Sequence, residues 1–294
     1  MTSVSGDKPL WRKIVDFPLV AMVIAAVLYF VTLALAATVG FLAPPVDGFN
    51  FDMKFEAIGG VMLLLLYKLI IRRLGEHPRD DLAISGAARP FAIGLSAGFI
   101  VFSLIVAVAA AFGVYRMTGE GNASDLLRQI IISAAFPAIS EEMLFRGIIL
   151  RWIEELGGSW AGLLVSAAVF GAAHLGNPDS GVVPAVFIAI EAGIMLGAAY
   201  LLTRSLWLPM GIHAAWNFTQ GEIYDIPVSG TSVHGLLVAR LSGPPLLTGN
   251  GFGLEASVIA LVIATLFGLW LLWLAICKGE LMKSWWVRRR TAAA

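Results

Sequence analysis

Long apolar runs, separated by short polar segments, constrain this chain more than any other feature. A helix needs about 20 predominantly apolar residues to cross a bilayer. We expect eight membrane helices, approximately at residues 17–42, 55–71, 91–114, 125–156, 159–175, 181–202, 206–218 and 256–277. The run 206–218 is short for a full crossing. The predicted fold is all-α: a polytopic integral membrane protein with about eight transmembrane helices, forming a single membrane domain over residues 1–294.

Composition supports a membrane environment. The chain is 59% hydrophobic and 14% charged, whereas soluble domains average about 45–50% apolar and about 25% charged residues. A formal net charge of zero gives no reason to expect a nucleic-acid partner. The one cysteine, Cys277, excludes an intrachain disulfide and a zinc-thiolate cluster. The expected surroundings are therefore the lipid bilayer, with no nucleic acid.

The distribution of basic residues predicts the orientation. Of the 20 Lys and Arg residues, 16 fall on the side of the two termini. The four on the other side are Lys54, Arg116, Arg128 and Arg240. Cytoplasmic loops carry the excess of Lys and Arg, so we expect both termini to be cytoplasmic, in a plasma (inner) membrane. Residues 1–16 are then a cytoplasmic N-terminal segment, 279–294 a basic cytoplasmic tail, and 219–254 a non-cytoplasmic loop.

Three ionisable residues interrupt the fourth apolar run. Such a group in hydrocarbon costs about 2.5–3.5 kcal/mol on insertion scales, so it is rarely present without a function. Glu142 and Arg146 are four residues apart on one helix face and can form an ion pair. Glu141 is rotated by about 100° from Glu142 and is free for another partner. A carboxylate in a poorly solvated pocket becomes a useful general base.

Two histidines are the candidate partners of the carboxylate that Arg146 leaves free. Phe170 and His174 share one helix face, as do His213 and Asn217. Each histidine alone is more often a packing residue. Together, two Glu, one Arg, two His and one Asn on three membrane helices are the parts of a hydrolytic site. Counted at about 1.5 Å per residue, His213 lies shallow in its helix and His174 deep, so tilted helices would be needed to bring them together.

Three other acidic residues lie in or at the ends of apolar runs, and each has a structural explanation. Glu191 interrupts the sixth apolar run and fits either a packing residue or a pathway residue. Glu154 and Glu155 end the fourth run and are most simply a solvated helix end.

The motifs Glu141-Glu142-x-x-x-Arg146, Phe170-x-x-x-His174 and His213-x-x-x-Asn217, in this order, resemble those of the CPBP family of intramembrane proteases. That family includes the eukaryotic CAAX prenyl endopeptidases and many bacterial relatives. One motif alone is a weak signal, whereas three in order within eight predicted spans are specific. The resemblance covers residues 125–218, the predicted catalytic core helices.

The resemblance implies hydrolysis of a peptide bond. By family analogy, Glu141 and His174 hold and activate a water, with Glu141 as the general base. His213 and Asn217 then donate hydrogen bonds to the oxyanion, where the loss of one such donor costs about 2.7–4 kcal/mol. Glu142, Arg146 and Phe170 would support the catalytic residues. The implied substrate is a protein or peptide in or at the membrane, of prenylated type or of another kind.

Other chemistries need comparison. Glu141, His174 and His213 would form a His2Glu set, the ligand type of catalytic zinc. However, the sequence has no His-Glu-x-x-His helix, and Asn217 beside His213 suits an oxyanion hole better, so we favour a site without a cofactor and keep a zinc-dependent protease as the alternative. A non-catalytic binding or immunity protein could keep the same fold. A transporter could use intramembrane Glu and His as a proton relay, although no internal repeat is detectable.

Overall fold

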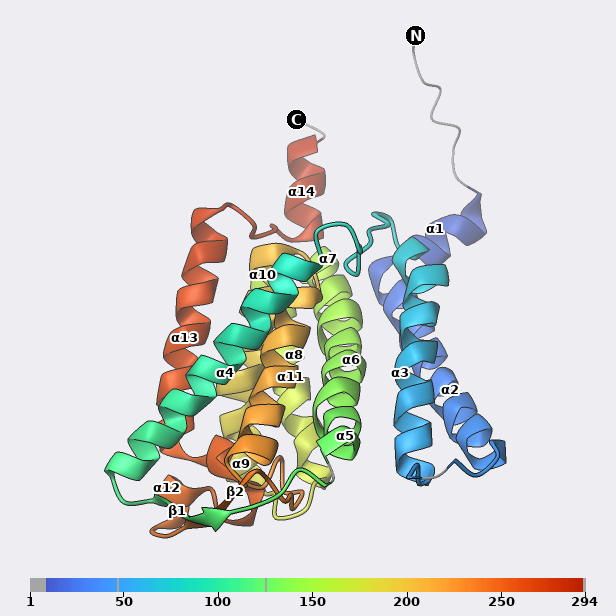
Figure 1. Ribbon diagram of the computed structural model, residues 1–294. Helices are drawn as coiled ribbons and strands as arrows, with labels where there is room; N and C mark the ends of the chain where they lie inside the picture. The colour runs from blue at the N-terminus through green and yellow to red at the C-terminus, as the bar shows by residue number, and fades with distance from the viewer. Residues whose placement is uncertain (1–8, 47, 125, 293–294) are drawn as a thin grey trace.

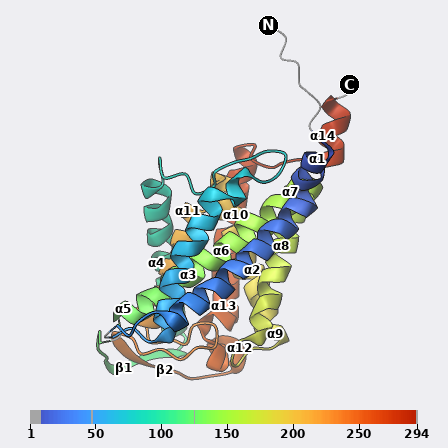
Figure 2. The same ribbon diagram turned by 90° about the vertical axis from the view of Figure 1, so that its right-hand side faces the viewer.

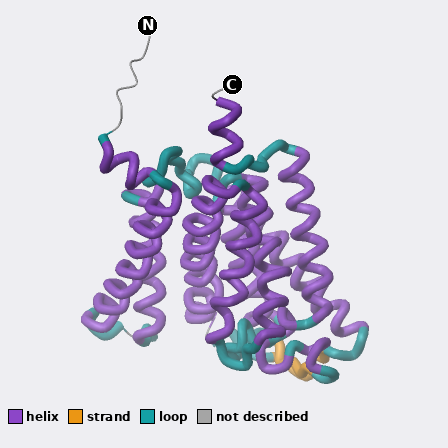
Figure 3. The backbone as a smooth tube through the Cα atoms, turned by 180° about the vertical axis from the view of Figure 1, so that it is seen from behind, coloured by secondary structure: helices purple, strands orange, loops and turns teal. Residues whose placement is uncertain are grey.

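The computed structural model describes residues 9–46, 48–124 and 126–292. It is mostly helical, at 73%, and its helices run side by side between two ends of the molecule (Figures 1 and 3). One end carries the N- and C-terminal segments, and the other carries the strands and the longest connecting loop (Figure 1). We call these the terminal end and the loop end. The terminal residues 1–8 of the predicted N-terminal segment lie outside the described residues.

The chain order of the elements is as follows. The α-helices are α1 (Leu10–Asp16), α2 (Pro18–Leu42), α3 (Phe51–Leu69), α4 (Ala88–Ala111), α5 (Leu126–Gln129), α6 (Phe136–Glu142), α7 (Arg151–Gly157), α8 (Ser159–Ala173), α9 (Val182–Ile188), α10 (Ile194–Thr203), α11 (Trp207–Phe218), α12 (Pro245–Thr248), α13 (Val258–Cys277) and α14 (Trp285–Ala292). The π-helical segments are η2 (Ile130–Ala135), η3 (Met143–Leu150), η5 (Ala189–Gly193) and η6 (Thr219–Ile223). The 3-10 segments are η1 (Ile71–Arg73), η4 (His174–Gly176), η7 (Asn250–Phe252) and η8 (Leu254–Ala256), and the strands are β1 (Tyr115–Glu120) and β2 (Leu237–Leu241).

Every apolar run predicted to span the membrane is helical. Within the described residues, five helices are long and apolar enough to cross a bilayer: Pro18–Leu42, Ala88–Ala111, Ser159–Gly176, Val182–Thr203 and Val258–Cys277. The helix formed by α5, η2, α6, η3 and α7 is long but carries the ionisable motif residues. α3 also carries several charges, and α11 is short. That these three helices also cross the membrane, which would make eight spans, stays a prediction.

The all-α prediction is wrong in one respect, because β1 and β2 form a small antiparallel sheet with Tyr115 opposite Leu241. The two strands lie more than 100 residues apart in the chain, so no local hairpin pattern announces them. The predicted loop 219–254 is also more ordered than expected, since it contains the end of a helix, β2 and short helical turns. Figure 2 shows these elements together at the loop end.

Glycines allow α4 and α11 to touch backbone to backbone. A Cβ on Gly98 would lie 2.4 Å from the carbonyl oxygen of Ile212, and one on Gly94 would lie 2.5 Å from that of Leu208. Both distances are shorter than any real Cβ contact, so only glycine fits. Small residues at helix interfaces permit this close approach in membranes. The α4 contact therefore sets the position of α11, which carries His213 and Asn217.

Replacing Gly98 by Ala is expected to destabilise the protein by about 1–3 kcal/mol, because the added methyl group forces two rigid helices apart. The measurement is the thermal unfolding temperature in detergent. The matched control is Gly181→Ala, since a Cβ at Gly181 meets no atom within 4 Å. Equal unfolding temperatures for the two variants would contradict the close α4–α11 contact.

The acidic pair at the end of α7 is buried, which contradicts the prediction of a solvated helix end. Glu154 is 0% exposed and accepts hydrogen bonds from the Ser159 hydroxyl and, at 2.5 Å, from Arg204. Glu155 is 3% exposed, and its backbone carbonyl accepts a 2.8 Å bond from Arg288. Cations from distant parts of the chain cover this helix end, and local sequence cannot show them.

Candidate active site

The four residues predicted to carry the chemistry line one cavity. Glu141, His174, His213 and Asn217 face a space of about 230 Å³ in the half of the bundle that adjoins the loop end. They come from three helical units: the long helix containing α6, the end of α8 with η4, and α11. The remaining lining residues are Glu56, Ile132, Ser133, Pro137, Asn177, Val228, Ser229 and Thr231.

The predicted ion pair forms in the protein interior. Nη1 of Arg146 lies 2.8 Å from Oε1 of Glu142, and both side chains are 0% exposed. The guanidinium also donates a 3.2 Å bond to the Ala192 carbonyl, and its Cζ lies 4.5 Å from the centre of the Phe170 ring. A cation over an aromatic face is attracted by the ring quadrupole. Arg146 thus joins the helix that presents Glu141 to the helices of Phe170 and Ala192.

Glu142 has a second partner that the sequence did not suggest. His213 Nδ1 lies 2.9 Å from Glu142 Oε1, the same oxygen that binds Arg146. The opposite nitrogen, Nε2, lies 3.9 Å from Glu141 Oε2. Glu142 therefore fixes the orientation of the His213 ring, and that ring directs Nε2 towards Glu141 and the cavity.

His174 is oriented by its own helix. Its Nδ1 lies 2.8 Å from the carbonyl oxygen of Phe170, one turn earlier. Because a carbonyl can only accept, Nδ1 carries the proton and Nε2 of the neutral ring is an acceptor. The Phe170 ring packs 4.7 Å from the His174 ring and 6.3 Å from the His213 ring, measured between centroids. Phe170 therefore packs against both imidazoles and supports them.

Asn217 joins α11 to the long helix. Its Nδ2 donates a 2.8 Å bond to the carbonyl of Ser133, in the π-helical segment η2. An amide nitrogen has two N–H donors, so a second one is left for another acceptor. Asn217 is 7% exposed and lines the cavity together with Ser133.

The difference in depth between the two histidines disappears in the folded protein. The helix of His213 does not end at Phe218: α11 has 12 residues and continues for five more as η6. His213 is therefore close to the middle of its helix. A π-helical continuation has no clear signature in the apolar pattern, so the helix predicted from the sequence, 206–218, was too short.

Sequence reasoning missed an acidic residue beside this site. Glu255 in η8 is 3% exposed, accepts a hydrogen bond from the Ser229 N–H, and is also bonded by the Trp216 side chain. Burial raises the pKa of the Glu255 carboxyl, against the opposing effects of nearby His174 and the Ser229 hydrogen bonds. With Glu191 and His174 it lines a chamber of about 30 Å³, large enough for a water. The sequence signal that could have indicated Glu255 is its position directly before the apolar run 256–277.

The zinc alternative requires a group of metal-ligating side chains. Among the described residues, no three His, Cys, Asp or Glu side chains are grouped so that they could hold a metal ion. Glu141, His174 and His213 share the cavity but do not form such a group. The expectation of no cofactor stays a prediction, and elemental analysis of the purified protein checks it.

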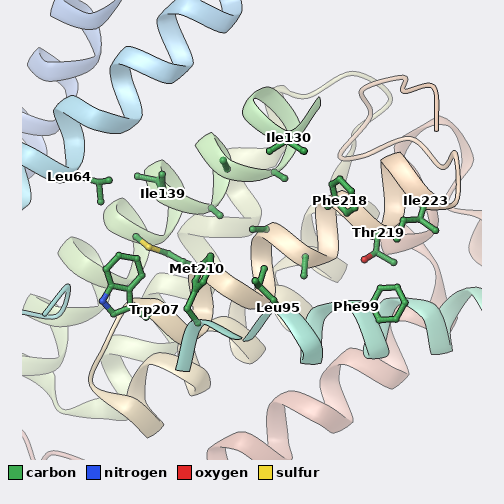
Figure 4. Close-up of a pocket in the computed structure, with 16 residues that line it drawn as sticks. Leu64, Leu95, Phe99, Ile130, Ile139, Trp207, Met210, Phe218, Thr219 and Ile223 are labelled. Carbon is green, nitrogen blue, oxygen red and sulfur yellow. The ribbon is translucent and has the colours of Figure 1, made fainter. Parts of the chain in front are cut away.

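A larger apolar cavity lies on the other side of α6 and α11. It measures about 520 Å³. Figure 4 shows Ile130 and Ile139 from the long helix facing Trp207 and Met210 from α11 across it. Its wall includes Ala214, the residue after His213. The two cavities are therefore separated by the helices that present Glu141, His213 and Asn217.

Comparison with known proteins supports the resemblance seen in the motifs. The family model described as type II CAAX prenyl endopeptidase Rce1-like matches residues 123–219. No curated protein and no solved structure showed a match. The matched segment contains the three motifs and every residue predicted to act in catalysis. Over residues 123–219, this chain is therefore similar to the Rce1-like type II CAAX prenyl endopeptidases.

Proposed function

We propose that the protein is an intramembrane endopeptidase that hydrolyses a peptide bond in a membrane-associated or prenylated-type protein. The observation that carries this proposal is the convergence of Glu141, His174, His213 and Asn217 on one cavity. The Rce1-like match supports the reaction class at the level of the family. The apolar cavity beside the site supports a substrate with an isoprenoid or another apolar chain.

In the proposed first step, Glu141 accepts a proton from a water whose other hydrogen is bonded by His174 Nε2. The resulting hydroxide attacks the carbonyl carbon of the scissile peptide. Glu141 is suited to this role because its side chain is 32% exposed to the cavity and forms no ion pair with Arg146. A positioned base contributes about 10²–10⁴-fold to such a step.

In the same step the carbonyl oxygen becomes an oxyanion. We assign its stabilisation to Nε2–H of His213 and the second amide hydrogen of Asn217. Both nitrogens of an imidazolium are donors, and Glu142 on Nδ1 stabilises that form of His213. Proton transfer from Glu141 to the amide nitrogen then breaks the carbon–nitrogen bond and gives a carboxylic acid and an amine, and the acid passes its proton to the amine.

We also propose that both termini are cytoplasmic and that eight helices cross the plasma (inner) membrane. The catalytic cavity has Asn177, Val228, Ser229 and Thr231 in its wall, all from loops at the loop end. In this orientation the cavity lies in the non-cytoplasmic half of the bilayer. Substrates would then enter from the non-cytoplasmic side.

The test compares membrane proteomes of cells that produce the wild-type protein or Glu141→Ala at equal membrane levels. We expect new protein termini that depend on Glu141. Identical termini in both samples would favour a non-catalytic binding protein with the same fold.

A further inference from the structure

The catalytic cavity contains a carboxylate that the proposed reaction does not use. Glu56 lies near the start of α3, outside the family match, and lines the cavity together with Glu141. Its Oε2 is buried and has no hydrogen-bond partner among the described residues. A buried carboxylate oxygen without a partner is costly, so its presence in a reaction cavity suggests a partner that arrives with the substrate.

The charges around Glu56 indicate what that partner is. Among the described residues that line the cavity, the acids are Glu56 and Glu141, and there is no Lys or Arg. Asp52 and Arg128 are close enough to interact electrostatically with Glu56, and neither lines the cavity. Lys54, two positions before Glu56, is turned away and donates bonds to the carbonyls of Ala43 and Pro44, at 3.3 and 3.0 Å. Within the part of the chain that the structure describes, no cation is therefore bonded to Glu56.

We propose that Glu56 binds a basic side chain of the substrate next to the scissile bond, so that the enzyme prefers substrates with Arg or Lys at that position. This inference rests on the proposed peptidase function. A guanidinium or ammonium group would give the Glu56 carboxylate its missing partner, and charge-assisted hydrogen bonds of this kind are stronger than neutral ones. Glu56 and the candidate catalytic residues line the same cavity of about 230 Å³. One basic substrate residue therefore places its side chain at Glu56 and its backbone at the candidate catalytic residues.

The test uses purified full-length protein in detergent and a peptide library in which each sequence occurs with Arg, Gln or Glu beside the cleavage site. For the wild-type protein we expect kcat/KM to be at least about tenfold higher for Arg than for Gln peptides. In Glu56→Gln this ratio should fall to about one. In Glu56→Lys the order should invert, with Glu peptides cleaved best, because like charges in a desolvated site repel strongly.

The matched control is Glu120→Gln, an acid at the exposed end of β1 outside the cavity, which should keep the wild-type ratio. Wild-type cleavage without a preference for basic residues would overturn the role of Glu56. An equal fall in kcat/KM for all peptides in Glu56→Gln would also overturn it, since Glu56 would then act on the reaction itself and not on the choice of substrate. If no peptide is cleaved in a Glu141-dependent manner, the proposed peptidase function fails, which is a different result.

Discussion

Replacing Arg146 by Met is expected to lower the free energy of unfolding by about 3–5 kcal/mol, because the substitution leaves a buried carboxylate without its cation. Glu142 and Arg146 are both 0% exposed, and their atoms lie 2.8 Å apart. Met fills a similar volume but offers no donor. His213 would be the one remaining partner of Glu142 among the described residues. The measurement is equilibrium unfolding in detergent.

A double variant separates the cost of the unpaired charge from the loss of packing. In Glu142→Gln combined with Arg146→Met, neither of the two positions carries a charge, and the amide oxygen can still accept from His213. We therefore expect at least half of the lost stability to return. The control is Arg72→Met, which breaks a partly exposed pair with Asp80 and should cost less than about 1 kcal/mol. An Arg146→Met variant no less stable than Arg72→Met would contradict a structural role for the buried pair.

The sequence predicts those features of this protein that depend on local periodicity. Apolar runs located the helices, and the four-residue spacing of Glu142 and Arg146 predicted their ion pair, which the structure confirms. The match to residues 123–219 confirms the family resemblance. These predictions succeed because a helix places positions i and i+4 on one face regardless of the rest of the fold.

Features that depend on distant parts of the chain were not predicted. The bond between His213 and Glu142 joins residues 71 positions apart, and spacing within one helix cannot reveal it. The same holds for the β1–β2 sheet and for the cations that cover Glu154. Glu56 and Glu255 were missed for another reason. Each lies at the edge of an apolar run, where an acid is ordinarily a solvated helix end, and only the fold brings them to the candidate catalytic residues.

Replacing Glu141 by Gln is expected to reduce kcat for peptide cleavage by about 10²–10⁴-fold, the usual contribution of a positioned general base. Gln has the same shape but cannot accept the proton from water. We expect KM and the unfolding temperature to change little, since Glu141 Oε2 has no hydrogen-bond partner within the described residues. The measurement is single-turnover cleavage of one peptide from the library. The control is Glu76→Gln, at the exposed terminal end.

The contrast with Glu142→Gln tests the division of roles between the adjacent carboxylates. Glu142 is fully buried and bonded to Arg146 and His213, so its neutralisation should lower both stability and activity. Neutralising Glu141 should lower activity alone, because this carboxylate faces the cavity and is not paired with Arg146. If Glu141→Gln retains more than about a tenth of wild-type kcat, another group removes the proton from water. His174 is then the remaining candidate base, since its Nε2 is the one acceptor nitrogen that the Phe170 carbonyl leaves available on that ring.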